Sequence, residues 1–137
     1  MKREELQQLY WIKLEIRELS MKIDQLKTMM AGGVSRISGL PRISGIGDRM
    51  GELMPEVADL EKILEEKLKR YLAELIRLET FIDQIDEAYL RLIFTYRYIK
   101  CLSWVQVAHR LGGSTADSVR MMHNRYLRNG KQAQSDR

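Results

Sequence analysis

Tyr98 to Arg128 read YIKCLSWVQVAHRLGGSTADSVRMMHNRYLR, a pattern that predicts two short helices joined by a glycine turn. Ser103 is followed three residues later by Gln106, a capping box that satisfies backbone donors at a helix start. Glycines 112–113 then end the first helix, because glycine adopts the left-handed conformation of a helix C-terminus at little steric cost. Thr115 is a favourable cap for the helix that follows.

Apolar residues recur at helical spacing in both predicted helices. The first helix carries a stripe of Val105, Ala108 and Leu111, and the second is expected to bury Val119, Met122 and Tyr126 or Leu127. This order of elements is that of a helix-turn-helix, whose second helix places its N-terminal residues in the DNA major groove. Two helices joined by a glycine turn also occur as plain packing units, so the pattern alone leaves both interpretations open.

The two predicted helices carry two groups of candidate DNA contacts, because contacts to bases determine sequence preference whereas contacts to phosphates fix the position of a protein on the duplex. The candidates for base contacts are Thr115, Ala116, Asp117, Ser118, Arg120 and Met121. The candidates for phosphate contacts are Ser103, Arg110, Asn124, Arg125, Arg128 and Lys131. His123 is expected near phosphate, His109 on an exposed face, and Trp104 in the core beneath the two helices.

Basic charge is concentrated in the same part of the chain. Residues 87–137 hold nine Lys and Arg against three acids, a net of 9 − 3 = +6, whereas residues 1–86 hold 14 basic and 16 acidic residues, a net of −2. Neutralisation of phosphates by Lys and Arg supplies most non-specific affinity for DNA. Double-stranded DNA is therefore the expected partner, although an acidic protein would exploit the same charge.

Composition narrows the class of protein. Charged residues make up 31% of the chain and proline occurs twice, which favours long helices. There is no apolar run long enough for a membrane span and no signal-peptide core at the N-terminus, so we expect no membrane partner. One cysteine fits the reducing cytoplasm of a bacterial host cell. The two histidines lack partners at catalytic or metal-binding spacing, so no enzyme activity, metal, cofactor or small-molecule substrate is expected.

The N-terminal half has the pattern of a coiled coil. Apolar residues alternate in steps of three and four from residue 9 to residue 30, which predicts a helix over about 3–30 and a seam that pairs with another helix. The seam could pair within the chain or between copies, and it is the candidate surface for a homo-oligomer. Its residues are Leu9, Ile12, Ile16, Leu19, Ile23 and Leu26, with Met30 next.

A second long helix is predicted from near Pro55 to about Ile85, with an earlier start at Asp48 as the alternative. Its seam runs through Val57, Leu60, Leu64, Leu68, Tyr71, Leu75, Leu78, Ile82 and Ile85. The glycine-rich segment 31–53 is expected to be a loop, and residues 87–100 a third helix that begins after Asp86. The predicted organisation is all-α: a helical hairpin or coiled-coil bundle over 1–85, a three-helix DNA-binding unit of helix-turn-helix type over 86–130, and a flexible tail over 131–137.

The run Leu102-Ser103-Trp104-x-x-Val107-Ala108-x-x-Leu111-Gly112, preceded by Tyr96-Arg97-Tyr98-Ile99, resembles the fourth conserved region of sigma-70-type factors. The whole chain resembles phage regulators of the RinA/ArpU type, which have long N-terminal helices, a glycine-rich loop and a sigma-like C-terminal reader. The resemblance implies activation of late phage genes. Sigma-like readers usually carry Arg and Glu where this chain has Ala116 and Asp117, so a different base preference is expected.

The sequence therefore predicts a homo-oligomeric, sequence-selective regulator of transcription that reads DNA with helix 115–128. RNA polymerase is a further partner that this interpretation allows. Two alternatives remain open: a coiled-coil interaction protein whose basic module binds RNA polymerase or another protein, and a DNA-binding component of viral genome packaging.

Overall fold

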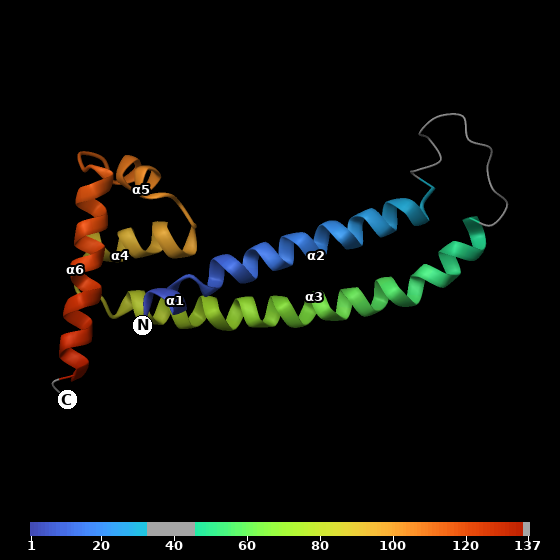
Figure 1. Cartoon of the computed structure of the whole chain (residues 1–137), viewed down its shortest axis with the longest axis horizontal. Helices are drawn as coiled ribbons and strands as arrows, with labels where there is room; N and C mark the ends of the chain where they lie inside the picture. The colour runs from blue at the N-terminus through green and yellow to red at the C-terminus, as the bar shows by residue number, and fades with distance from the viewer. Residues whose placement is uncertain (33–45, 136–137) are drawn as a thin grey trace. The chain divides into compact units, whose positions relative to one another are not determined.

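The computed structural model describes residues 1–32 and 46–135 of the chain. Within these two stretches the backbone forms helices and no strand, which confirms the predicted all-α class. In chain order the elements are α1 (Arg3–Leu6), α2 (Gln8–Met30), α3 (Ile46–Asp83), α4 (Ala88–Phe94), the π-helix η2 (Thr95–Ile99), α5 (Trp104–Leu111) and α6 (Ala116–Ser135) (Figure 1). None of the helices described is both long and apolar enough to cross a lipid bilayer.

The chain divides into two units, each with its own contacts. The paired-helix unit comprises Ile12–Tyr71, and the terminal unit comprises Met1–Trp11 together with Leu72–Arg137. The predicted boundary at residue 85 does not coincide with this division, because the end of α3 packs with the C-terminal helices. The Phe81 ring lies edge-on to Phe94, with 5.8 Å between ring centroids.

In the paired-helix unit, α2 and α3 lie side by side and share a buried apolar cluster (Figure 1). Its members are Leu19, Ile23, Met30 and Val57, with Leu26, Leu53, Leu60 and Leu64 packed against them. Ion pairs flank the cluster: the Lys27 ammonium lies 2.8 Å from the Glu61 carboxylate, and the Lys67 ammonium 2.6 Å from that of Glu15. Lys67 is half-buried and the other three partners are exposed, so both pairs are in contact with water and add little stability. The apolar cluster therefore holds the two helices together.

The predicted seam of the first helix is therefore filled within one chain. Leu19, Ile23 and Leu26 belong to the cluster shared with α3. Leu9 is buried in the terminal unit, and Ile12 and Ile16 are half-buried. In the second helix the predicted seam position Leu68 is 48% exposed. Leu68 ends two consecutive four-residue steps, from Leu60 to Leu64 and from Leu64 to Leu68. Because this spacing departs from the alternation of three and four, it rotates the apolar stripe away from the partner helix.

Several predicted helix ends are wrong. α3 begins at Ile46, close to the alternative start at Asp48, and carries Pro55 within it, so the segment expected as a loop over 31–53 is helical from residue 46 onward. Residues 33–45 of that segment lie outside the described residues. α6 extends to Ser135, into the segment expected as a tail over 131–137. A single glycine in a helix, here Gly130, costs only about 1 kcal/mol and does not stop it.

The predicted third helix is divided in two. α4 starts after Glu87, not after Asp86, and the Glu87 side chain makes no capping bond. The Arg91 guanidinium instead secures this junction by donating to the carbonyl oxygens of Ile85 (2.6 Å) and Asp86 (2.9 Å). The chain then widens into η2, which ends where the Lys100 N–H donates to the carbonyl five residues earlier. Tyr98 lies within this wider turn and is 5% exposed.

Candidate nucleic-acid interface

The start of α5 is capped as the sequence predicted. The backbone N–H of Ser103 donates to Oε1 of Gln106 at 2.9 Å, and the backbone N–H of Gln106 donates to Oγ of Ser103 at 3.3 Å. Two backbone donors that have no helical partner are thereby satisfied. The Ser103 hydroxyl is exposed, and accepting this bond leaves its own proton available for a phosphate oxygen.

The turn between α5 and α6 is fixed by three local features. Gly112 and Gly113 have φ angles of 72° and 70°, the left-handed region that favours glycine. The hydroxyl groups of Ser114 and Tyr89 lie 2.6 Å apart, which ties the turn to α4. Thr115 then caps α6, because its Oγ1 accepts from the Ser118 backbone N–H at 3.1 Å. The turn and cap thus set the direction in which α6 leaves α5.

A small apolar core holds α4, α5 and α6 together. Its fully buried members are Ile93, Val107 and Val119, and Ala108 is 6% exposed. The predicted stripe through Val105 is wrong, because Val105 is 69% exposed. The residues of α5 that face this core are Trp104, Val107, Ala108 and Leu111, at the i, i+3, i+4, i+7 spacing of an amphipathic helix.

The candidates for base contacts lie at the start of α6, as expected from their position in the chain. Ala116 is half-buried, whereas Asp117, Arg120 and Met121 are exposed, as are Thr115 and Ser118. Nη2 of Arg120 lies 3.2 Å from Oδ1 of Asp117, one turn before it on the same helix. Both partners face solvent, so the pair is weak, and Arg120 can exchange Asp117 for another acceptor.

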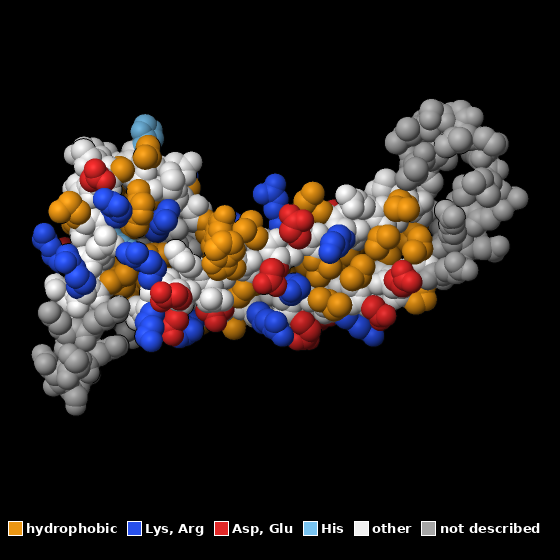
Figure 2. All heavy atoms as spheres, in the orientation of Figure 1, with side chains coloured by type: hydrophobic (Ala, Val, Ile, Leu, Met, Phe, Trp, Pro, Cys, Tyr) orange, Lys and Arg blue, Asp and Glu red, His pale blue; other side chains and the backbone are white. Residues whose placement is uncertain are grey.

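The candidates for phosphate contacts do not share one environment. Arg110, Arg125 and Arg128 are exposed, and the Arg110 guanidinium lies over the Tyr96 ring, 5.6 Å from its centroid. Asn124 is half-buried, and its side-chain oxygen is already bonded. Lys131 lies within α6, and its side chain is outside the part described. Lys and Arg side chains gather on the face drawn over α4 to α6 (Figure 2).

His123 is a core residue, so the expected position near phosphate is wrong. It is 1% exposed, and its ring lies 5.0 Å from Phe94 and 4.8 Å from Trp104, measured between centroids. Nε2 hydrogen-bonds the Tyr98 hydroxyl, and Nδ1 lies 3.0 Å from Oδ1 of Asn124. Burial, aided by the neighbouring positive charges of Arg3 and Arg97 and opposed by the hydrogen bond to Asn124, lowers the pKa of His123 to about 4, so the ring is neutral at pH 7. Burial likewise raises the pKa of Tyr98 to about 12.

Sequence reasoning also missed two arginines that support this core. Arg97 donates to the Leu102 carbonyl at 2.9 Å, and its guanidinium lies 4.6 Å from the centroid of the Trp104 ring. Arg3 reaches α6 from the other end of the sequence and donates to Asn124 at 2.7 Å. The Arg97 contacts span only five to seven residues and the Tyr-Arg-Tyr run could have pointed to them, but nothing local in the sequence pairs Arg3 with Asn124.

Comparison with models of known protein families, with curated proteins and with solved structures gave no match. What this site can bind is therefore inferred from its own residues. The outer side of the first turn of α6 is exposed and follows the Gly112–Gly113 turn. Further along α6 lie the exposed cationic side chains of Arg120, Arg125 and Arg128. Among the described residues, no cluster of His, Cys, Asp or Glu could hold a metal ion.

Proposed function

We propose that this chain is a sequence-selective DNA-binding regulator of transcription, in which α5 and α6 form a helix-turn-helix and α6 is the recognition helix. The observation that carries the proposal is the packing of α5 against α6 through Val107, Ala108 and Val119. The turn between the two helices is capped at both ends, by Gly112 at the end of α5 and by Thr115 at the start of α6. This packing leaves the first two turns of α6 free on their outer side. A helix presented in this way fits the major groove of B-DNA, which is about 12 Å wide.

The start of α6 supplies side chains that can read bases. Arg120 can donate two hydrogen bonds to guanine once it leaves Asp117, and the exposed Met121 side chain suits a thymine methyl group. Asp117 and Ser118 add an acceptor and a hydroxyl on the same turn. Further along α6, Arg125 and Arg128 are better placed for the phosphate backbone than for bases.

The net charge of +6 over residues 87–137 supports the same partner, since cations are needed where phosphates approach. The sequence resemblance to RinA/ArpU-type regulators extends the proposal to activation of late phage genes in the cytoplasm of a bacterial host, with RNA polymerase as a second partner. A homo-oligomer would place two recognition helices on one site. Because Leu19 and Ile23 pack within the chain, such an oligomer would use other apolar side chains. Leu72 and Ile76, both more than half exposed on α3, supply such a surface.

The experiment compares Arg120→Ala and Arg128→Ala with the unchanged protein. The DNA probes are a duplex from the region upstream of the coding sequence and a scrambled duplex of the same composition. Arg120→Ala is expected to lower discrimination between the two duplexes by about 1–3 kcal/mol, the value of a bidentate base contact. Arg128→Ala is expected to weaken both equally. If the protein without substitutions binds neither duplex at low salt, the proposal fails.

A second candidate is a factor that uses the same basic face to bind a protein. The observation that favours it is the exposure of two apolar side chains, Val105 (69%) on α5 and Met121 (58%) on α6. Substitution of Val105 by Ser is expected to leave DNA affinity unchanged under the first proposal. A role in genome packaging is distinguished by preference for a packaging site over the upstream region.

A further inference from the structure

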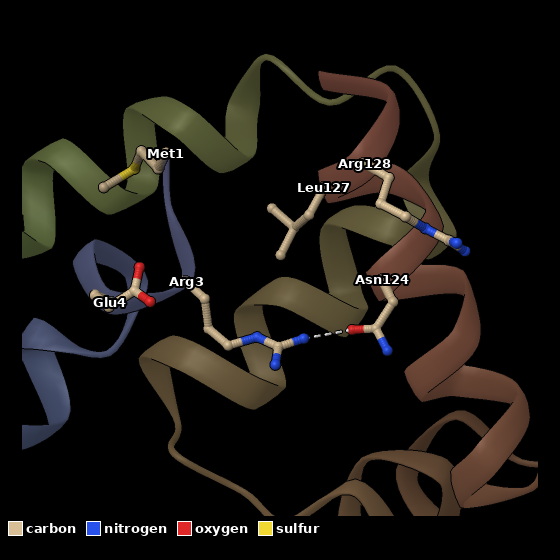
Figure 3. A pocket seen from close by; sticks show the side chains of 6 residues that line it. All are labelled: Met1, Arg3, Glu4, Asn124, Leu127 and Arg128. Atoms are coloured by element: carbon tan, nitrogen blue, oxygen red, sulfur yellow. Dashed lines mark hydrogen bonds between the residues drawn. The ribbon is translucent and has the colours of Figure 1, made fainter. Parts of the chain in front are cut away.

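The N-terminal segment contacts the proposed recognition helix through one hydrogen bond. Nη2 of Arg3 lies 2.7 Å from the side-chain oxygen of Asn124, across the hollow drawn in Figure 3. A guanidinium carries only donors. The Asn124 atom that faces Arg3 is therefore the carbonyl oxygen Oδ1, and the amide nitrogen Nδ2 points away from Arg3, as Figure 3 shows.

The same oxygen accepts a second hydrogen bond from inside the protein. Nδ1 of His123 lies 3.0 Å from Oδ1 of Asn124, and two acceptors cannot bond, so Nδ1 carries the proton of the neutral ring. Nε2 is then the acceptor for the Tyr98 hydroxyl. A carbonyl oxygen has two lone pairs, and Arg3 and His123 use both of them. Asn124 has no accepting capacity left for a ligand.

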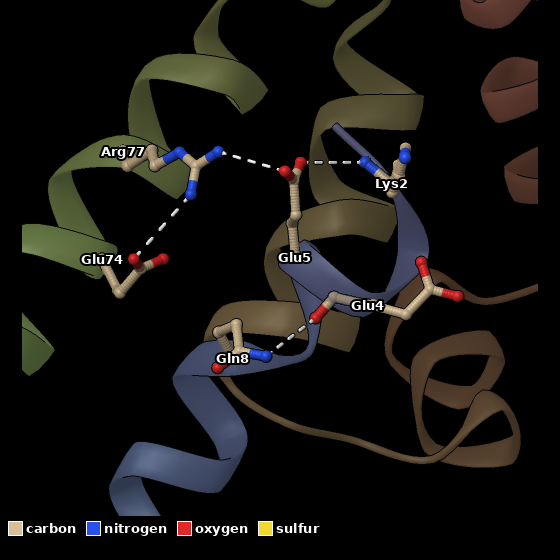
Figure 4. Close-up of polar contacts among 6 residues, drawn as sticks. All are labelled: Lys2, Glu4, Glu5, Gln8, Glu74 and Arg77. Carbon is tan, nitrogen blue, oxygen red and sulfur yellow. Dashed lines mark hydrogen bonds and ion pairs between the residues drawn. The ribbon is translucent and has the colours of Figure 1, made fainter.

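Arg3 is held in this position by an anchored segment. Oε2 of Glu5 accepts from the backbone N–H of Lys2 at 3.1 Å, and Oε1 of Glu5 lies 3.4 Å from Nη2 of Arg77 on α3 (Figure 4). Leu6, the next residue, is 1% exposed. The backbone is thus held on both sides of Arg3. Less conformational entropy is lost when the Arg3 guanidinium bonds to Asn124 than if Arg3 lay in an unanchored segment.

We infer that Asn124 meets DNA as a hydrogen-bond donor only, through Nδ2 to a backbone phosphate oxygen, and that Arg3 is the positioning residue that sets this role. The inference rests on the proposed function. Asparagine recognises adenine by accepting from N6 and donating to N7 at the same time. Because Oδ1 of Asn124 already accepts from Arg3 and His123, it cannot also accept from N6 of adenine. A donor one turn beyond Arg120 is suited to phosphate, which offers only acceptors.

The test is a double-mutant cycle on the full-length protein, with duplex DNA from the upstream region as the probe. Affinity is measured for the unchanged protein, Arg3→Ala, Asn124→Ala and the double variant. Asn124→Ala is expected to weaken binding about tenfold to a hundredfold, the range for a hydrogen bond to a charged group. Arg3→Ala is expected to weaken it by a similar factor in the unchanged background and by less than about twofold when Asn124 is absent.

Lys2→Ala is the matched control, since it removes the same charge one residue away and leaves the bond to Asn124. It is expected to cost several times less affinity than Arg3→Ala. Asn124→Asp is the second variant. Its carboxylate still accepts from Arg3 and His123, so the thermal midpoint is expected to be unchanged or higher. It has no donor, so DNA binding is expected to fall further than for Asn124→Ala.

The outcomes separate the inference from the proposed function. If the protein without substitutions does not bind DNA, both fall. If it binds DNA but Arg3→Ala has the same effect with and without Asn124, Arg3 acts as a free charge and only the inference is overturned. Asn124→Asp that binds DNA normally would overturn the donor role. A loss for Asn124→Ala that is confined to duplexes with one particular base pair would overturn the phosphate assignment.

Discussion

Lowering the pH is expected to destabilise the protein through His123, which is buried among Phe94, Tyr98 and Trp104. Its pKa is about 4 in the folded chain and 6.5 in the unfolded chain. Above pH 6.5 the ring is neutral in both states and contributes no pH dependence. Between pH 6.5 and 4 the unfolded chain takes up a proton that the folded chain does not, so the free energy of unfolding falls.

The size of the loss follows from the two pKa values of His123. Each pKa unit corresponds to about 1.4 kcal/mol, so the full loss at pH 4 is roughly 3 kcal/mol. Below pH 4 the folded chain is protonated as well, and the loss stops growing. A loss of this size is a large fraction of the 5–15 kcal/mol that stabilises a typical domain, so it is readily measured.

The assay is urea denaturation followed by circular dichroism, at pH values between 7 and 4. Carboxylates also titrate in this range, so the quantity to compare is the difference in stability between the unchanged protein and His123→Gln. That difference is expected to shrink by roughly 3 kcal/mol from pH 7 to pH 4. His109→Gln is the control, because His109 is the other histidine and is exposed. A difference for His123→Gln that stays constant with pH would show that His123 does not take up a proton on unfolding in this range.

Three further predictions concern α5, the turn after it and α6. Val107→Ala is expected to lower the free energy of unfolding by about 1.5–3 kcal/mol, whereas Val105→Ala, on the exposed side of the same helix, is expected to change it by less than about 0.5 kcal/mol in urea denaturation. Gly112→Ala is expected to cost about 1–2 kcal/mol because of its positive φ, and Gly130→Ala within α6 to add about 0.5–1 kcal/mol; opposite shifts in the thermal midpoint check both. Ser103→Ala is expected to cost about 1 kcal/mol through loss of the cap, and an unchanged thermal midpoint would contradict the capping geometry.

Features fixed by near neighbours in the sequence were predictable. The bonds between Ser103 and Gln106, the positive φ of Gly112 and the cap at Thr115 each involve residues within a few positions of one another. Val119 was predictable as a core residue because it forms an apolar stripe at helical spacing with Met122 and Tyr126. Val105 was assigned to the wrong face because a short helix offers two stripes of similar apolar content, and packing against α4 decides between them.

Features that depend on distant parts of the chain were not predictable. His123 was expected near phosphate because a polar residue on a basic helix is normally solvated, yet Tyr98 and Asn124 satisfy both ring nitrogens and permit its burial. The contact between Arg3 and Asn124 joins residues 121 positions apart. The π-turn that contains the buried Tyr98 has no signature in residues 95–99 that distinguishes it from a regular helix.

We expect the basic face of the α5–α6 region to bind DNA with sequence preference. The most direct test is the affinity of the unchanged protein for its upstream duplex and for a scrambled duplex at increasing salt. About four phosphate contacts per chain give a slope near −3.6 in log affinity against log salt, a loss of roughly a hundredfold from ~50 to ~200 mM. The side chains that would make them are Arg110, Arg125, Arg128 and Lys131. Tighter binding to the upstream duplex with such a slope is the predicted result. No binding to either duplex at low salt, or equal binding to both, would contradict the claim.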